Sequence, residues 1–228
     1  MSPKTEIYLE VGTRRVFAGA LTWPGWCRSG RTEDAAIETL HDYARRYAAV
    51  LSAAGITFTP PRGAGHLQVV ERLKGDATTD FGAPSIAPAA DDEPIKPADA
   101  RRLGKILEAC WAALDSAAKA AASKKLRKGP RGGGRELSAI VTHVLDAESA
   151  YLRSMGGSFK RDERADLSSE ASRLREAILE TLSARARGEP PPDNPRRKAK
   201  PWTPRYFVRR TAWHALDHAW EIEDRAEP

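Results

Sequence analysis

The feature that most limits the fold of this chain lies in its second half, where apolar residues recur at helical spacing in four successive segments. The first segment begins just inside Pro97 and the fourth just inside Pro204, and proline is well tolerated at the first position of a helix. The predicted helices cover residues 97–118, 137–155, 167–187 and 203–225. Four amphipathic helices with three connections pack most readily as a four-helix bundle. We therefore predict an all-α domain over residues 97–228.

The start of the chain shows a different pattern, in which short extended segments precede one helix. Residues 6–11 alternate between apolar and polar side chains, which is typical of a strand. A helix is expected to begin after Thr32, whose hydroxyl can cap it, and to end at Gly55. The predicted strands are 6–11, 15–21, 26–28 and, after the helix, 67–73. Residues 1–74 are thus predicted to form a small α+β domain of β-β-β-α-β order.

Between these two regions, residues 75–96 are rich in Ala, Pro, Gly and Asp and show no periodicity. Such a composition is typical of a linker. The sequence therefore predicts two domains, residues 1–74 and 97–228, joined by a linker.

Composition argues against several classes of protein. No apolar run reaches the roughly 18 residues of a membrane span, and the first residues lack the order of a signal peptide. Cys27 and Cys110 form no CxxC pair and no disulfide framework, so we expect a reducing, cytoplasmic setting. Much of the net charge of +6 lies in basic runs at 124–131 and 196–200, both in expected loops. Solvated loop charge explains these runs better than a nucleic-acid interface, which would need them to converge in space.

Two histidines of the last predicted helix lie on its apolar face. On a helical wheel at roughly 100° per residue, His214 and His218 fall in the middle of the stripe that also contains Phe207. Imidazoles four residues apart are neighbours on a helix and can bind one cation. Burying two ring nitrogens among apolar side chains is costly unless something binds them, and a divalent metal does so well. An HxxxH pair is also a common coincidence on helix surfaces.

A third histidine and a carboxylate lie on the second predicted helix. The wheel places His143 roughly 130° from the centre of that helix's apolar stripe, on a side of alanines that would allow close approach to another helix. Glu148 falls near the centre of the stripe and is the candidate catalytic residue. Beside a histidine cluster this carboxylate would orient a ligand or accept a proton. Alternatively, it reaches out of a groove or pairs with an arginine.

The segments that carry these residues resemble those of a known family. Ile140–Glu148 looks like the second helix of the DinB-like superfamily, and Trp213–His218 resembles its last helix. The resemblance covers about residues 97–226 and implies a four-helix bundle that binds one divalent metal, commonly zinc or nickel. The implied metal ligands are His143, His214 and His218.

The same resemblance favours a metal-dependent enzyme, either a transferase or an isomerase, that acts on a small-molecule substrate. Members of the superfamily include thiol-dependent enzymes that use mycothiol or bacillithiol, and many others have no assigned activity. Arg131 and Arg135 flank a run of three glycines and could bind the anionic part of a low-molecular-weight thiol, although the run reads more simply as a flexible loop. The alternative is a non-catalytic stress-response or binding protein with a structural metal site.

The N-terminal pattern resembles the HicB-like antitoxin domain. Phe17–Leu21, a Trp-Pro-Gly turn, a short strand and a helix opening at Thr32 occur in that order. The similarity covers roughly residues 5–74. Because no toxin and no DNA-binding tail accompanies it, the resemblance implies ligand recognition or a scaffold role, including partner binding, rather than antitoxin function.

An aromatic side chain recurs every seven residues on the side of the last predicted helix that faces away from the histidines. These residues are Tyr206, Trp213 and Trp220. Such a stripe most often packs within a bundle, but it could also form the surface of a homodimer or contact the N-terminal domain.

Overall fold

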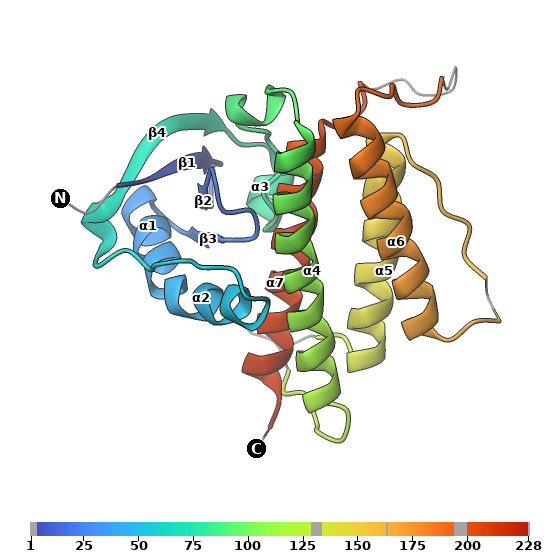
Figure 1. Cartoon of the computed structure of the whole chain (residues 1–228). Helices are drawn as coiled ribbons and strands as arrows, with labels where there is room; N and C mark the ends of the chain where they lie inside the picture. Colours follow the sequence, from blue (N-terminus) through green and yellow to red (C-terminus); the bar gives the residue numbers. More distant parts are fainter. Residues whose placement is uncertain (1–3, 129–133, 163, 194–199, 228) are drawn as a thin grey trace. The chain divides into compact units, whose positions relative to one another are not determined.

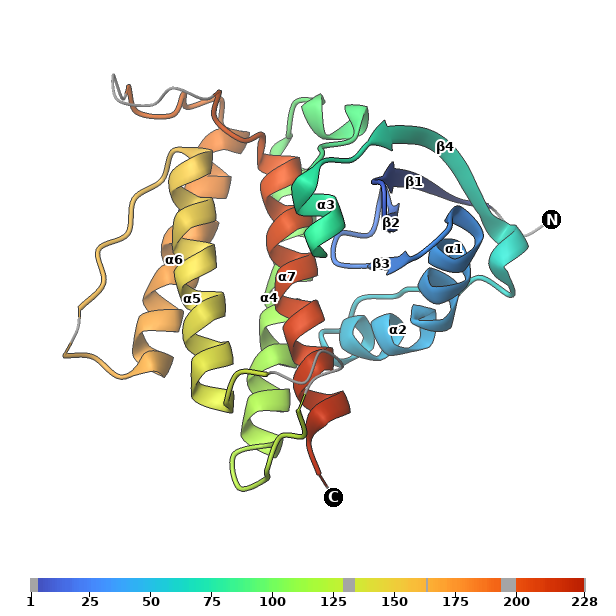
Figure 2. The same cartoon turned by 180° about the vertical axis from the view of Figure 1, so that it is seen from behind.

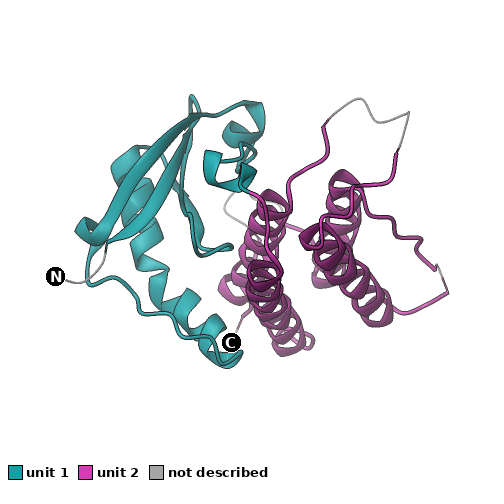
Figure 3. Ribbon diagram, turned by 45° about the horizontal axis from the view of Figure 1, so that its top comes forward, with its two compact units in different colours: residues 1–93 teal, residues 94–228 magenta. Residues whose placement is uncertain are grey.

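The computed structural model describes residues 4–128, 134–162, 164–193 and 200–227. The chain folds as two compact units, Met1–Glu93 and Pro94–Pro228, which we call unit 1 and unit 2 (Figure 3). None of the helices in the described stretches has the length and apolar character needed to cross a membrane.

Unit 1 is built on a four-stranded sheet with the strand order β3-β2-β1-β4 (Figure 1). The strands are β1 (Thr5–Val11), β2 (Val16–Ala20), β3 (Cys27–Gly30) and β4 (Leu67–Lys74), close to the predicted ranges. β1 pairs antiparallel with β2, and β2 with β3, whereas β4 runs parallel to β1. A parallel neighbour requires a crossover connection, which the helices between β3 and β4 supply.

The segment predicted as one helix between Thr32 and Gly55 is two helices. They are α1 (Glu33–Asp42) and α2 (Ala44–Ala53). The two helices are divided at Tyr43, whose ψ of −3° lies at the edge of the helical range, so the prediction of a single helix is wrong. A tertiary contact lies beside this break: the Leu40 carbonyl near the end of α1 accepts a 2.8 Å hydrogen bond from the buried Trp26 indole. Periodicity within one helix cannot reveal such a contact.

The segment expected as a linker, residues 75–96, contains regular structure. α3 (Ala77–Phe81) is capped by the side chain of Asp76, and a 3₁₀ turn follows at Ala89–Asp92. Both elements belong to unit 1, since the boundary between the units follows Glu93.

A buried carboxylate explains how this segment is held without apolar periodicity. Glu10 of β1 is 0% exposed. It accepts hydrogen bonds from the Thr79 hydroxyl at 2.5 Å, from the Ser85 amide at 3.0 Å and from the Ile86 amide at 3.1 Å. Polar donors, two of them from the backbone, therefore bind the segment to the sheet, and they leave no pattern in the sequence.

The described part of unit 2 contains four long helices at the predicted positions. They are α4 (Pro97–Ala120), α5 (Leu137–Met155), α6 (Leu167–Ala186) and α7 (Pro204–Arg225). α4 packs against α6 and α7, and α5 also packs against α6 and α7 (Figure 2). Each helix therefore has two helical neighbours around a shared apolar interior.

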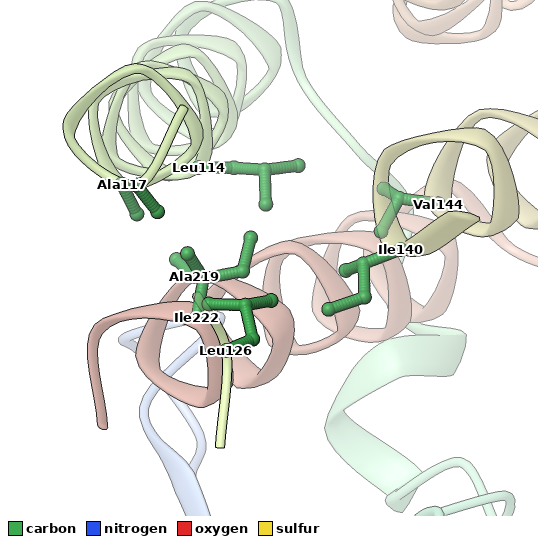
Figure 4. Close-up of a cluster of buried hydrophobic side chains, with 8 residues drawn as sticks. Leu114, Ala117, Leu126, Ile140, Val144, Ala219 and Ile222 are labelled. Carbon is green, nitrogen blue, oxygen red and sulfur yellow. The ribbon is translucent and has the colours of Figure 1, made fainter. Parts of the chain in front are cut away.

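One apolar cluster of this interior joins three of the helices (Figure 4). Its buried members include Leu114 of α4, Ile140 and Val144 of α5, and Ala219 and Ile222 of α7. Val144 directly follows His143, and Ala219 directly follows His218. The packing of α5 against α7 that forms this cluster therefore also fixes the backbone of two of the predicted metal ligands.

Replacing the buried carboxylate of unit 1 tests its role in holding α3 and two residues that follow it, Ser85 and Ile86. We expect Glu10→Ala to lower the free energy of unfolding by about 3 kcal/mol, because it leaves buried donors without an acceptor. Urea unfolding followed by circular dichroism measures the change. Glu6→Ala, an exposed glutamate of the same strand, is the matched control and should change stability by less than about 0.5 kcal/mol. Equal effects of the two substitutions would contradict this account.

Candidate metal centre

Three histidines from two helices converge in unit 2. His143 comes from α5, and His214 and His218 come from α7. Each offers one ring nitrogen, and these atoms all lie within 4.8 Å of one another. The Nε2 atoms of His143 and His214 are 3.3 Å apart. The structure thus brings together the three histidines that the sequence predicted as metal ligands.

The burial of the three rings follows their positions on the helices. His214 is 6% exposed and His218 is 9% exposed, as expected for the apolar face of α7. His143 is half-buried, in agreement with its position away from the apolar stripe of α5. The cluster therefore lies at the contact between α5 and α7, with one edge toward solvent.

The spacing of the ring nitrogens suits a metal ion. Zinc binds imidazole nitrogen at about 2.0–2.1 Å, so two nitrogens on one tetrahedral ion lie about 3.3–3.4 Å apart. The 3.3 Å separation between His143 and His214 matches this value. Three imidazoles also match the ligand number of catalytic zinc sites, which keep a further position open. The residues present therefore fit a divalent cation.

Burial and mutual proximity favour the neutral imidazole, which is the form that binds metals. Burial lowers the pKa of His214 well below its ordinary value of 6.5, and the neighbouring His218 and His143 lower it further. Burial also lowers the pKa of His143, with a further contribution from the positive charge of Arg135.

A carboxylate that the sequence interpretation missed binds one of the histidines. The Nδ1 atom of His218 lies 2.8 Å from Oε2 of Glu221. Glu221 in turn accepts a 2.6 Å hydrogen bond from the buried Arg225. The signal was present in the sequence as spacing, since Glu221 follows His218 by three residues and Arg225 follows Glu221 by four, which places all three on neighbouring turns of one helix face.

Cationic and aromatic side chains lie beside the cluster. The guanidinium of Arg210 lies 5.5 Å from the centre of the Tyr151 ring and 4.9 Å from that of Trp213. The Tyr151 ring is 5.8 Å from the ring of His214. After burial and the other two histidines, the charges of Arg210 and Arg135 also lower the pKa of His214. The charges that act on His214 are thus positive, whereas the carboxylates of Asp146 and Glu221 also act on His143.

The structure describes one of the two arginines that were predicted to bind an anionic cofactor. Arg131 lies outside the described residues. Arg135 is exposed just before the start of α5, and its charge acts on both His143 and His214. The structure therefore places Arg135 near the cluster.

The candidate catalytic residue Glu148 is buried, at 2% exposure, but the structure does not place it with the histidines. Its Oε1 accepts a 2.8 Å hydrogen bond from the Trp111 indole of α4. The nearby charges that act on it belong to Arg175 of α6 and Asp115 of α4. His143 and Glu148 are five residues apart on α5, so they point about 140° away from each other around the helix.

The aromatic side chains that recur along the last helix are buried within the single chain. Tyr206 is 8%, Trp213 4% and Trp220 3% exposed.

The buried position of Glu148 gives a testable pH dependence. Burial raises its pKa from 4.5 to about 7. The folded protein therefore retains a proton that the unfolded chain has released, and stability falls as pH rises from about 4.5 through about 7. The full loss is on the order of 3 kcal/mol.

Glu148→Gln, which cannot ionise, should remove this loss. We expect the variant to gain stability relative to the wild type between pH 5 and pH 8 in thermal or urea unfolding. Glu180→Gln, an exposed position on α6, is the control and should follow the wild type at both pH values. A constant difference between Glu148→Gln and the wild type across this range would show that Glu148 is ionised throughout.

Comparison with known proteins assigns unit 2 to a family. Neither curated proteins nor solved structures gave a significant match to the chain. A family model described as the DinB superfamily matches residues 106–222, slightly more than half of the chain. This match spans most of α4, all of α5 and α6, and α7 through His218 to Ile222. The chain therefore belongs to the DinB superfamily.

Proposed function

We propose that unit 2 is a metal-binding four-helix bundle in which His143, His214 and His218 hold one divalent metal, zinc or nickel. The observation that carries the proposal is the convergence of three ring nitrogens within 4.8 Å. Membership of the DinB superfamily supports it. The lowered pKa values of His143 and His214 support it as well, because a proton does not compete with the metal for these nitrogens at neutral pH.

We further propose that this centre is the active site of a thiol-dependent transferase or isomerase. A metal held by three neutral imidazoles acts as a Lewis acid that stabilises the ionised form of a bound water or thiol. The chain's own residues would hold the anionic reactant: Arg135 and Arg210 supply positive charge near His214. Tyr151 supplies an aromatic side chain next to the same histidine.

The cofactor proposed for this reaction is a low-molecular-weight thiol with an anionic part. Arg135 supports this choice through its position near the cluster. The contribution of Arg131 remains a prediction. Glu148 is less suited to proton transfer at the metal, because its described contacts are with α4 and α6.

A second candidate function is binding without catalysis, with the metal site as a structural element. A cavity of about 860 Å³ in unit 1 favours it. Trp23 and Phe58 line this cavity together with the cationic side chains Lys4 and Arg62. On this reading unit 1 is a HicB-like domain that recognises a partner or ligand there.

Metal analysis of the purified protein tests the metal site. We expect one equivalent of zinc or nickel per chain, lost on replacing any one of His143, His214 or His218 by Ala. His66→Ala, a histidine of unit 1, is the control and should retain the metal. A wild-type protein that neither carries metal nor binds it at micromolar concentration would contradict the proposal.

The two candidate functions differ in their response to a thiol. The enzyme proposal predicts that mycothiol or bacillithiol binds the metal-loaded protein and that Arg135→Ala weakens this binding without removing the metal. Titration of the metal-loaded protein with the thiol measures the affinity. Stoichiometric metal with no thiol binding would instead favour the non-catalytic function.

A further inference from the structure

We propose that Glu221 and Arg225 are positioning residues of the metal site. Arg225 holds Glu221, and Glu221 fixes the ring of His218 with its Nε2 atom free for the metal. This inference rests on the proposed metal binding and adds to it two residues outside the histidine triad.

Glu221 and His218 form a hydrogen bond. Its length is 2.8 Å, between Oε2 of Glu221 and Nδ1 of His218. An ionised carboxylate can only accept a hydrogen bond, so the Nδ1 atom must carry the proton. In the neutral ring the lone pair then belongs to Nε2, the atom opposite the carboxylate. A carboxylate that orients a histidine in this way is a common partner of metal-binding imidazole and raises its basicity.

Glu221 is in turn held by the hydrogen bonds of Arg225. Its other oxygen, Oε1, accepts a 2.6 Å hydrogen bond from Nη1 of Arg225. The same guanidinium donates from Nε to the Arg127 carbonyl at 2.8 Å and from Nη2 to the Arg135 carbonyl at 3.0 Å. Arg225 is only 7% exposed. Three acceptors in different directions therefore hold the guanidinium, which leaves little freedom for the carboxylate it binds.

The backbone that supplies those acceptors is also held in place. An isolated bridge pairs Leu126 with Ala226, and the Arg127 amide donates to the Arg225 carbonyl at 2.8 Å. Residues 126 and 127, which follow α4, thus pair with the end of α7. Gly134 passes so close to Arg225 that a Cβ there would overlap the guanidinium, and its φ is +156°. A side chain at position 134 would therefore displace the guanidinium of Arg225 from this place.

The arrangement makes the ligands unequal. His218 has a fixed acceptor for its Nδ1 proton, whereas the buried Nδ1 atom of His214 has no hydrogen-bond partner among the residues that the structure describes. We therefore expect His218 to be the ring already oriented before the metal arrives, with its orientation set by Glu221.

A metal-affinity measurement on matched variants tests this inference. Glu221→Gln should weaken zinc binding by about 10–100-fold in a competition titration with a chromophoric chelator. Arg225→Lys should weaken it in the same direction, because lysine lacks the fork that binds Glu221 and the loop carbonyls together. In the double variant the two effects should not multiply, since Arg225 acts through Glu221. Glu180→Gln, the exposed control on α6, should match the wild type.

The tautomer of His218 provides a readout that a purely structural role would not change. In ¹⁵N NMR of the metal-free protein, the wild type should show the Nδ1-protonated form of His218, and Glu221→Gln should shift the ring toward a mixture of tautomers. An unchanged tautomer, or zinc affinity within twofold of the wild type in Glu221→Gln, would overturn the inference while leaving the metal site in place. Absence of both zinc and nickel binding by the wild type would instead remove the proposed function and this inference together.

Discussion

The arrangement of unit 2 depends on the packing of α5 against α7, because this contact brings imidazoles from two helices together in a largely buried place. Ring nitrogens that lose water must find another partner, and the Nε2 atoms of His143 and His214 lie next to each other. Two Nε2 atoms at 3.3 Å can share one proton or one metal ion. The lowered pKa values of His143 and His214 disfavour an added proton that would turn either ring into a cation. Both rings are therefore in the neutral form that a divalent cation requires.

Three carboxylates illustrate how the surroundings decide what a buried or half-buried acid does. Glu10 is fully buried and accepts hydrogen bonds from the chain around it, so it serves the fold of unit 1. Glu148 is buried with one hydrogen bond from Trp111, and burial raises its pKa to about 7. Glu221 is half-buried and lies between a histidine and an arginine. Its contact with His218 makes it the carboxylate that can influence a metal ligand.

The sequence predicted the helices of unit 2 and their buried faces well, because apolar periodicity reports directly which side of a helix packs inward. It placed His214 and His218 correctly on that side. His143 lay off the stripe, on a side of alanines that allows close approach, and mainly the resemblance to the DinB superfamily indicated that it would join them. The helical wheel also explains why Glu148 does not lie with the histidines. It places Glu148 near the centre of the apolar stripe of α5 and His143 roughly 130° from that centre. What the sequence could not show were contacts made by single polar groups: the indole bond beside the break at Tyr43, the donors around Glu10 and the bond from Glu221 to His218.

The central claim is that three imidazoles of unit 2 bind one metal ion, and X-ray absorption spectroscopy of the zinc- or nickel-loaded protein tests it most directly. We predict a first coordination shell with three imidazole ligands; for zinc these would lie at about 2.0–2.1 Å, with the remaining positions filled by light atoms. Substitution of His143 should reduce the imidazole contribution from three to two. A wild-type spectrum with one imidazole or none, or one that the His143 substitution leaves unchanged, would contradict the account.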